Sequence, residues 1–181
     1  TMWISLNIIS DMVDVKDIDP EELALRLTMS TAETEGVEKM NTHLEQVITA
    51  HIMDVQPHPN ADKLTVCEVD TGIEKLRVVC GAPNHKKGDM VALAPVGTRL
   101  GEDFEVKKAK IRGEESFGML CSERELGLSD DHSGIMILPE DTEKGVSLGS
   151  LYPAWSDTRI EIDNKSITHR PDLWSHLGFA R

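Results

Sequence analysis

Residues 57–64 read PHPNADKL, residues 79–84 read VCGAPN, and residues 107–113 read KKAKIRG. These segments, and other clusters of Gly, Pro, Asn and Asp, separate short runs rich in Val, Ile, Leu and Thr at residues 47–55, 64–69, 76–80, 90–94 and 135–138. Several short apolar runs with turn residues between them are typical of a β-barrel or a β-sandwich. The sequence therefore predicts one small closed β-sheet within residues 44–152.

The residues before this sheet carry a clear helix start. Asp19 can act as the N-cap, Pro20 suits the first helical position, and Glu22 completes a capping box. Leu23 and Leu27 then form an apolar stripe at i, i+4. We expect a helix from Pro20 to about Met29, between a short strand near the N-terminus and another at residues 34–39.

The residues after the sheet repeat this arrangement. Residues 159–163 alternate between polar and apolar, as a strand does, and Pro171 begins a segment with Leu173 and Leu177 at i, i+4. The sequence therefore predicts a mainly β protein with α+β flanks, in which the barrel is inserted into a discontinuous small α/β domain. Its two halves are residues 1–40 and 153–181, and we expect the chain to continue beyond Arg181.

The distribution of charge along the chain indicates where a nucleic acid could bind. The net charge of -13 opposes general affinity for nucleic acid, because such affinity requires Lys and Arg to displace counterions. One dense positive cluster stands out at residues 107–112, where Lys108, Lys110 and Arg112 recur with period two. On a strand these three side chains would share one face and could contact RNA phosphates. The alternative is a solvated face that Glu114 and Glu115 partly neutralise.

Composition and cysteine usage limit the class of protein. With 39% apolar residues and no long apolar run or signal peptide, the 181-residue chain is expected to be soluble and cytoplasmic. His51, His58, Cys67 and Cys80 show no spacing of a known zinc site, so we expect no metal site. Neither Cys121 nor the group Ser129, Asp131 and His132 follows a nucleophile turn, so we expect no catalytic site.

Four segments in order resemble the tRNA-binding OB-fold: PHPNADKL (57–64), VCGAPN (79–84), KAKIRG (108–113) and SFGMLCS (116–122). Proteins with this domain include relatives of the endothelial-monocyte-activating polypeptide, some methionyl-tRNA synthetases, and the β subunits of bacterial phenylalanyl-tRNA synthetases. The flanks resemble the start of the β subunits, through the segments WISLN (3–7), DPEELA (19–24), TEGVE (34–38), ELGLSDDHSG (125–134), RPD (170–172) and LGFAR (177–181).

This resemblance implies a five-stranded OB-fold barrel at residues 44–152 in the non-catalytic N-terminal part of a phenylalanine-tRNA ligase β subunit. The implied partners are tRNA(Phe) and an α subunit in an α2β2 heterotetramer, with no membrane or DNA. ATP and Mg would serve the whole enzyme, and this part would need no cofactor. The residues expected to bind RNA are Asn60, Lys63, Lys107, Lys108, Lys110, Arg112 and Ser116.

Two other functions stay open. A stand-alone dimeric tRNA-binding protein would consist of little more than the barrel, and a protein-interaction module would suit the negative net charge. Base stacking by an OB-fold needs exposed aromatic rings, and near the basic cluster the chain has Phe104 and Phe117.

Overall fold

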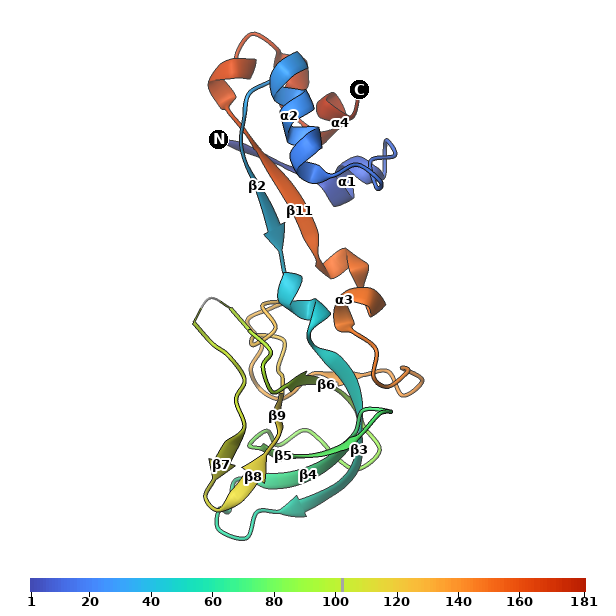
Figure 1. The fold of residues 1–181 in the computed structure, drawn as a ribbon, viewed down its shortest axis with the longest axis vertical. Helices are drawn as coiled ribbons and strands as arrows, with labels where there is room; N and C mark the ends of the chain where they lie inside the picture. Colours follow the sequence, from blue (N-terminus) through green and yellow to red (C-terminus); the bar gives the residue numbers. More distant parts are fainter. Residues whose placement is uncertain (102) are drawn as a thin grey trace. The chain divides into compact units, whose positions relative to one another are not determined.

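Strand β3 (Ile48–Pro57) is the middle strand of the sheet that forms the wall of a barrel (Figure 1). The structure is a computed structural model that describes residues 1–101 and 103–181. The chain divides into a barrel unit, residues 41–155, and a flanking unit, residues 1–40 and 156–181. No helix among the described residues is long and apolar enough to span a membrane.

The strands of the barrel unit pair antiparallel throughout. Strand β3 pairs with β4 (Thr65–Asp70) on one side and with β6 (Met90–Pro95) on the other. The register of the β3–β4 pair shifts between Ile52 and Asp54, a bulge of the kind that lets a long strand bend around a barrel. The remaining pairs join β4 to β5 (Lys75–Cys80), and β6 to both β9 (Gly118–Leu120) and β10 (Ile137–Leu138).

The free edge of β5 closes the barrel against the chain that leads into β9. The Phe117 N–H donates to the Arg77 carbonyl at 2.8 Å. The Val79 N–H donates to the Ser116 hydroxyl at 3.1 Å, so a side chain replaces a backbone acceptor at this position. The strand order around the barrel is therefore β3, β4, β5, β9, β6, which confirms the predicted five-stranded OB-fold class.

Strand β6 is buried on both faces, which explains its unbroken run of apolar residues. Val91 and Leu93 point into the barrel and pack with Ile52 and Val69. Met90 and the alanines of β6 face a second cluster outside the barrel, formed with Leu44, Val47, Leu126 and Leu148. Because residues on alternate sides of one strand belong to two clusters, β6 joins both parts of the core.

Short elements complete the barrel unit. They are η1 (Thr42–Glu45), β7 (Ala109–Ile111), β8 (Glu114–Ser116), α3 (Leu148–Leu151) and η2 (Pro153–Trp155). Residues 122–126 form a turn in which the Leu126 N–H donates to the Ser122 carbonyl at 3.2 Å.

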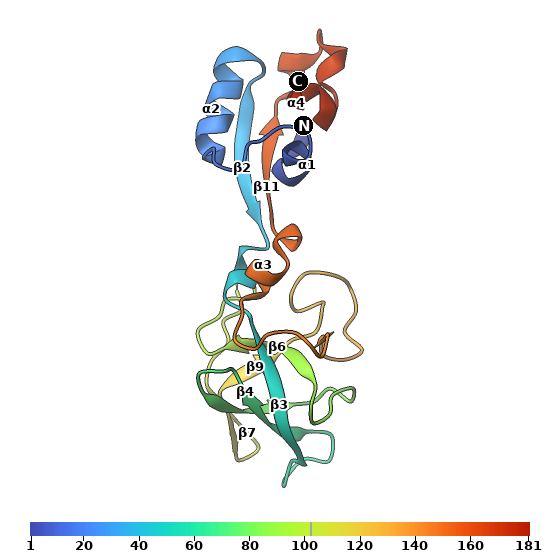
Figure 2. The same cartoon turned by 90° about the vertical axis from the view of Figure 1, so that its right-hand side faces the viewer.

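The flanking unit is a three-stranded sheet in which the two sequence halves interleave. Strand β11 (Asp157–Ile162) lies between β1 (Met2–Ser5) and β2 (Thr34–Met40). Helix α2 (Pro20–Ser30) packs on this sheet through Leu23, Ala24 and Leu27 (Figure 2). The Glu22 N–H donates to the Asp19 carboxylate at 3.1 Å, as the N-cap prediction requires.

Helix α1 (Leu6–Ser10) is capped by the Ser5 hydroxyl, since the Ile8 N–H donates to Ser5 Oγ at 3.2 Å. One local prediction in the flanking unit was wrong, because the segment after Pro171 is not one helix. It forms η4 (Pro171–Leu173), and α4 (His176–Ala180) begins separately after the extended N-cap Ser175, following η3 (Asn164–Ile167) earlier in the chain.

Gly118 offers a test of the β6–β9 contact. A Cβ there would lie 2.9 Å from the Ala94 carbonyl oxygen, whereas a Cβ at Gly97 would meet nothing within 4 Å, and both glycines have positive φ. We expect Gly97→Ala to cost about 1 kcal/mol through backbone strain alone. Gly118→Ala should cost roughly 2 kcal/mol more, because β9 must also shift away from β6. Urea denaturation of both variants measures this difference, and equal costs would contradict the contact.

We propose that the barrel unit folds alone, since both of its apolar clusters lie within residues 41–155. We expect a protein of these residues to unfold in one cooperative transition, followed by circular dichroism during heating. A gradual loss of signal without a transition would show that the barrel needs the flanking unit.

Candidate nucleic-acid interface

Two loops of the barrel meet at one side of it. The first, residues 58–64, joins the first and second barrel strands, and the second, residues 96–117, joins the fourth and fifth. In OB-folds these two loops and the neighbouring sheet face bind oligonucleotides. The two loops carry all seven residues predicted to contact RNA, two on the first loop and five on the second, and hydrogen bonds join the two loops.

The His58 ring holds these loops together. His58 is buried, and its Nε2 lies 2.9 Å from the Ile111 carbonyl oxygen of the second loop. Its Nδ1 accepts the Asn60 N–H at 3.0 Å, so Nδ1 is the bare nitrogen and Nε2 carries the hydrogen. Asn60 adds a second link, because its side-chain amide donates to the Arg112 carbonyl at 3.1 Å. Asn60 therefore helps to position Arg112 in the second loop.

Strands β7 and β8 form a basic hairpin with a two-residue turn. Arg112 and Gly113 both have positive φ, 47° and 104°, as a tight hairpin turn requires. The prediction that Lys108, Lys110 and Arg112 share one strand face was wrong for Arg112, because this residue occupies the turn. Lys108 and Lys110 keep the period-two relation.

Two acidic residues of β8 neutralise part of the hairpin. Lys108 Nζ lies 2.8 Å from a Glu115 carboxylate oxygen and 4.6 Å from the centroid of the Phe117 ring. The hydrogen bond and the charge of Lys108 lower the pKa of Glu115. Arg77 of β5 pairs with Glu114 at 2.9 Å. Such exposed pairs contribute little stability, but they reduce the positive charge that a phosphate would meet.

Four of the predicted cations remain available. Lys63, Lys107, Lys110 and Arg112 are exposed and make no ion pair within residues 1–101 and 103–181. They lie on the two loops that His58 and Asn60 connect. The arrangement can hold phosphate groups by charge at several points along one edge of the barrel.

Ser116 does not face solvent as the prediction required. Its side chain is buried, and its hydroxyl accepts the Val79 N–H and donates to the Gly118 carbonyl at 3.0 Å. Both hydrogen-bonding roles of the hydroxyl therefore serve barrel closure.

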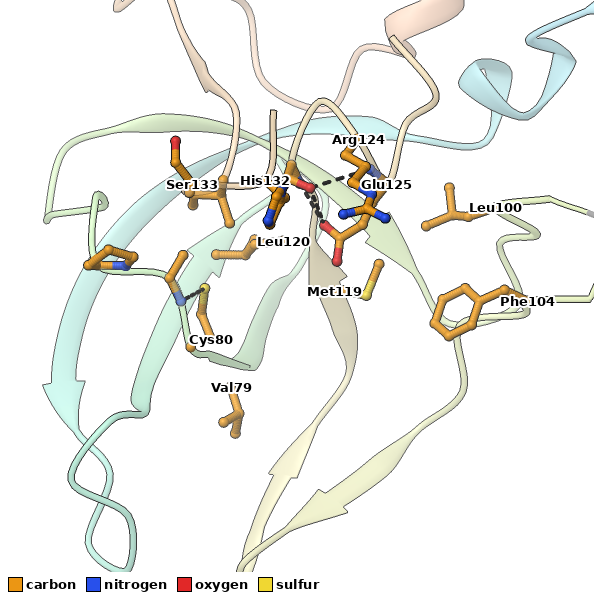
Figure 3. A pocket seen from close by; sticks show the side chains of 16 residues that line it. Val79, Cys80, Leu100, Phe104, Met119, Leu120, Arg124, Glu125, His132 and Ser133 are labelled. Carbon is orange, nitrogen blue, oxygen red and sulfur yellow. Dashed lines mark hydrogen bonds between the residues drawn. The ribbon is translucent and has the colours of Figure 1, made fainter. Parts of the chain in front are cut away.

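A hollow of about 880 Å³ adjoins the second loop (Figure 3). Its lining includes the apolar side chains of Cys80, Leu100, Met119, Leu120 and Ile135, together with the exposed ring of Phe104. The other side is built by residues 122–135, and Asn84 fixes this segment to the loop after β5. The Asn84 amide donates to the Ile135 carbonyl at 2.8 Å, and its oxygen accepts the Ile135 N–H at 2.9 Å.

The family model described as "Putative tRNA binding domain" matches residues 47–147, more than half of the chain. The chain belongs to this family of tRNA-binding domains. The matched range lies within the barrel unit and contains both loops of the interface.

Similarity extends beyond this tRNA-binding domain into the flanking unit. The phenylalanine-tRNA ligase β subunit of Syntrophotalea carbinolica is 49% identical over 180 residues, covering 99% of this chain. The β subunit from Anaeromyxobacter dehalogenans is also 49% identical, over 181 residues. The chain spans 22% of the length of each of these proteins. Among solved structures, a methionyl-tRNA synthetase related protein from Pyrococcus horikoshii is 21% identical, with a TM-score of 0.42 over 56% of this chain and 86% of that one.

The three thiols of this tRNA-binding domain are core residues. Burial raises the pKa of Cys67 to about 11 and that of Cys121 to about 12, and it also raises the pKa of Cys80. Protonated thiols are poor nucleophiles and poor metal ligands. Within residues 1–101 and 103–181, no three or more His, Cys, Asp or Glu side chains gather as a metal site would need.

Sequence reasoning missed Arg77 and the hollow. Arg77 lies in a run of mostly apolar residues, and only the pairing of β5 with the segment before β9 brings it to the hairpin. The hollow depends on residues from β5, β9 and three loops, and no local pattern marks it. Phe104 was the one available indication, since an exposed ring near a basic cluster is a feature of RNA-binding surfaces.

We expect His58→Ala to lower the free energy of unfolding by about 2 kcal/mol, because it removes a buried ring and leaves the Asn60 N–H and the Ile111 carbonyl without that partner. The exposed His132 provides the control, and His132→Ala should change stability by no more than about 0.5 kcal/mol. Urea denaturation gives both values. Similar small changes in the two variants would show that His58 does not hold the loops together.

Proposed function

We propose that this chain is the N-terminal, non-catalytic part of a phenylalanine-tRNA ligase β subunit, and that its barrel unit binds tRNA. The observation that carries the first part is the 49% identity over 99% of the chain, which includes the flanking unit as well as the barrel. A protein made of the barrel alone would have no counterpart of residues 1–40 and 156–181.

The proposal of tRNA contact rests on the two connected loops. Lys63, Lys107, Lys110 and Arg112 would contact phosphates, while Lys108, already paired with Glu115, would contribute less. Asn60 would act by holding Arg112 in place, since its amide bonds to the Arg112 carbonyl. The chain as a whole is acidic, and its basic residues in these two loops form a local edge of the barrel. The barrel would therefore bind RNA through this edge and not through its whole surface.

The whole protein would attach phenylalanine to tRNA(Phe) in the cytoplasm, with ATP and Mg, as an α2β2 heterotetramer with an α subunit. ATP and Mg would serve the whole enzyme, and we propose no cofactor for this part. The role of this part is to position tRNA and to support assembly.

A protein-interaction function is the second candidate, favoured by the net charge of -13 and by the neutralisation of Lys108 and Arg77. Such a barrel would bind another protein through the same loops and would have no affinity for RNA. The salt dependence of tRNA binding separates the two functions, because phosphate contacts release counterions and protein contacts of this kind do not.

The test compares two triple variants with the same change in charge count. Replacing Lys107, Lys110 and Arg112 by Ala should weaken tRNA binding and should reduce the slope of log affinity against log salt by about 2 to 3, since each phosphate contact contributes nearly one. The control replaces Lys16, Lys39 and Lys165 by Ala, exposed lysines of the flanking unit, and should leave most of the slope unchanged. Fluorescence anisotropy with labelled tRNA at several salt concentrations measures both.

Equal slopes for the original chain and the first triple variant would contradict the RNA-binding edge. An original chain without measurable tRNA affinity at low salt would favour the protein-interaction function.

A further inference from the structure

We propose that the hollow beside Phe104 receives one unstacked nucleobase, so that the barrel unit contacts a base of the RNA as well as its phosphates. This inference rests on the proposed function and adds a base-binding site to it. The stacking platform is the Phe104 ring, and the group that reads the edge of the base is the Glu125 carboxylate (Figure 3).

Phe104 is the ring of the barrel unit that is free to stack. The unit has four aromatic residues, Phe104, Phe117, Tyr152 and Trp155. The Phe117 ring is covered by the Lys108 ammonium, and Tyr152 and Trp155 stack on each other with centroids 4.0 Å apart. Phe104 is 51% exposed, and none of the ring contacts among the described residues involves it. Nucleobases stack on such rings in many single-stranded nucleic-acid sites.

The surroundings of Phe104 suit a nucleotide more than an isolated apolar group. Phe104 borders the large hollow and also a smaller one, which is lined by Arg99, Lys107 and two carboxylates, Asp103 and Glu105. Arg99 pairs with Glu105 at 4.0 Å, so within the described residues Lys107 is the cation of this hollow left to meet the phosphate of a base on the ring. From Lys107 the same loop continues to Lys110 and Arg112, so the base site and the phosphate sites form one continuous path.

The large hollow has an apolar floor, and its polar side chains include Arg124, His132 and one fixed carboxylate, that of Glu125. Leu100, Cys80 and Met119 provide apolar surface, and a volume of about 880 Å³ is ample for one base. The Glu125 oxygen Oε2 accepts from the Ser122 N–H at 2.7 Å and from its hydroxyl at 2.9 Å, which fixes the side chain. Its Oε1 has no hydrogen-bond partner within the described residues and can accept an N–H.

The free Oε1 of Glu125 leads us to expect a preference among the bases. Adenine, cytosine and guanine carry exocyclic amines that can donate to a carboxylate, as cytosine does to Glu or Asp in DNA recognition. Uracil presents carbonyl oxygens at the same edge and offers only its ring N–H. The site should therefore prefer amino-bearing bases to uracil. In Glu125→Gln the Ser122 donors would retain the amide oxygen, and the free amide nitrogen would donate and shift the preference toward uracil.

The experiment measures binding of tRNA and of single-base RNA oligomers of about 12 nucleotides, within the site size of one OB-fold. The proteins are the 181-residue chain and its variants Phe104→Ala, Phe104→Trp, Glu125→Gln and the control Ile73→Ala. Ile73 is a more exposed apolar residue, in the turn between β4 and β5. Phe104→Ala should weaken tRNA binding about tenfold with an unchanged salt slope, whereas Phe104→Trp and Ile73→Ala should bind as the original chain does.

The outcomes separate this inference from the function on which it rests. If Phe104→Ala binds RNA as the original chain does while the loss of Lys107, Lys110 and Arg112 lowers the salt slope, the hollow is not a base site and the phosphate edge stands. Equal affinity for adenine, cytosine and uracil oligomers in both the original chain and Glu125→Gln would overturn the role of Glu125. Failure of the original chain to bind tRNA and all oligomers would overturn both proposals, and the hollow would then suit an apolar side chain of a protein partner.

Discussion

The barrel depends on how the free edge of β5 is satisfied. An unpaired strand edge exposes backbone donors and acceptors, and here the edge closes through the Phe117 N–H and the Ser116 hydroxyl. This closure fixes the residues just before β9, and with them the basic hairpin, whose Glu114 then reaches Arg77 of β5. The candidate interface is therefore a result of barrel closure. The cations of the hairpin lie beside the sheet because the segment that follows them must reach β5 to close the barrel.

The electrostatic character of the chain is local. An overall charge of -13 would repel RNA at long range, but this repulsion is screened within about 8 Å at physiological salt. Within that distance the two glutamates of β8 matter more than the total charge, because Glu115 forms an ion pair with Lys108 and Glu114 forms one with Arg77. What remains is a narrow set of free cations. Such a surface favours a limited number of phosphate contacts over broad nonspecific binding.

The sequence was most informative where one local signal determined one element. The capped helix after Asp19 and the apolar runs of the barrel strands were predictable from their neighbours alone. Arg112 was misplaced because strand periodicity was extended through a residue whose positive φ depends on the following Gly113 and on the hydrogen bond from Asn60. Ser116 was misassigned because its hydroxyl bonds to Val79, which lies 37 residues away in the sequence, and no local pattern reports such a bond. The hollow could not be predicted for the same reason.

The basic hairpin has a further consequence for how the barrel would meet a ligand. Its two strands have three residues each. The Ser116 hydroxyl fixes its base to β5, and the contacts nearer its tip are also polar: the His58 ring, the Asn60 amide and the pair formed by Arg77 and Glu114. Isolated hairpins of this size are marginally stable in water, whereas the sheet behind it is held by tightly packed apolar side chains. We expect the hairpin that carries the cations to be flexible and the barrel sheet behind it to be rigid. Such a pairing lets a surface adjust to the contour of a folded RNA without deforming the scaffold that presents it.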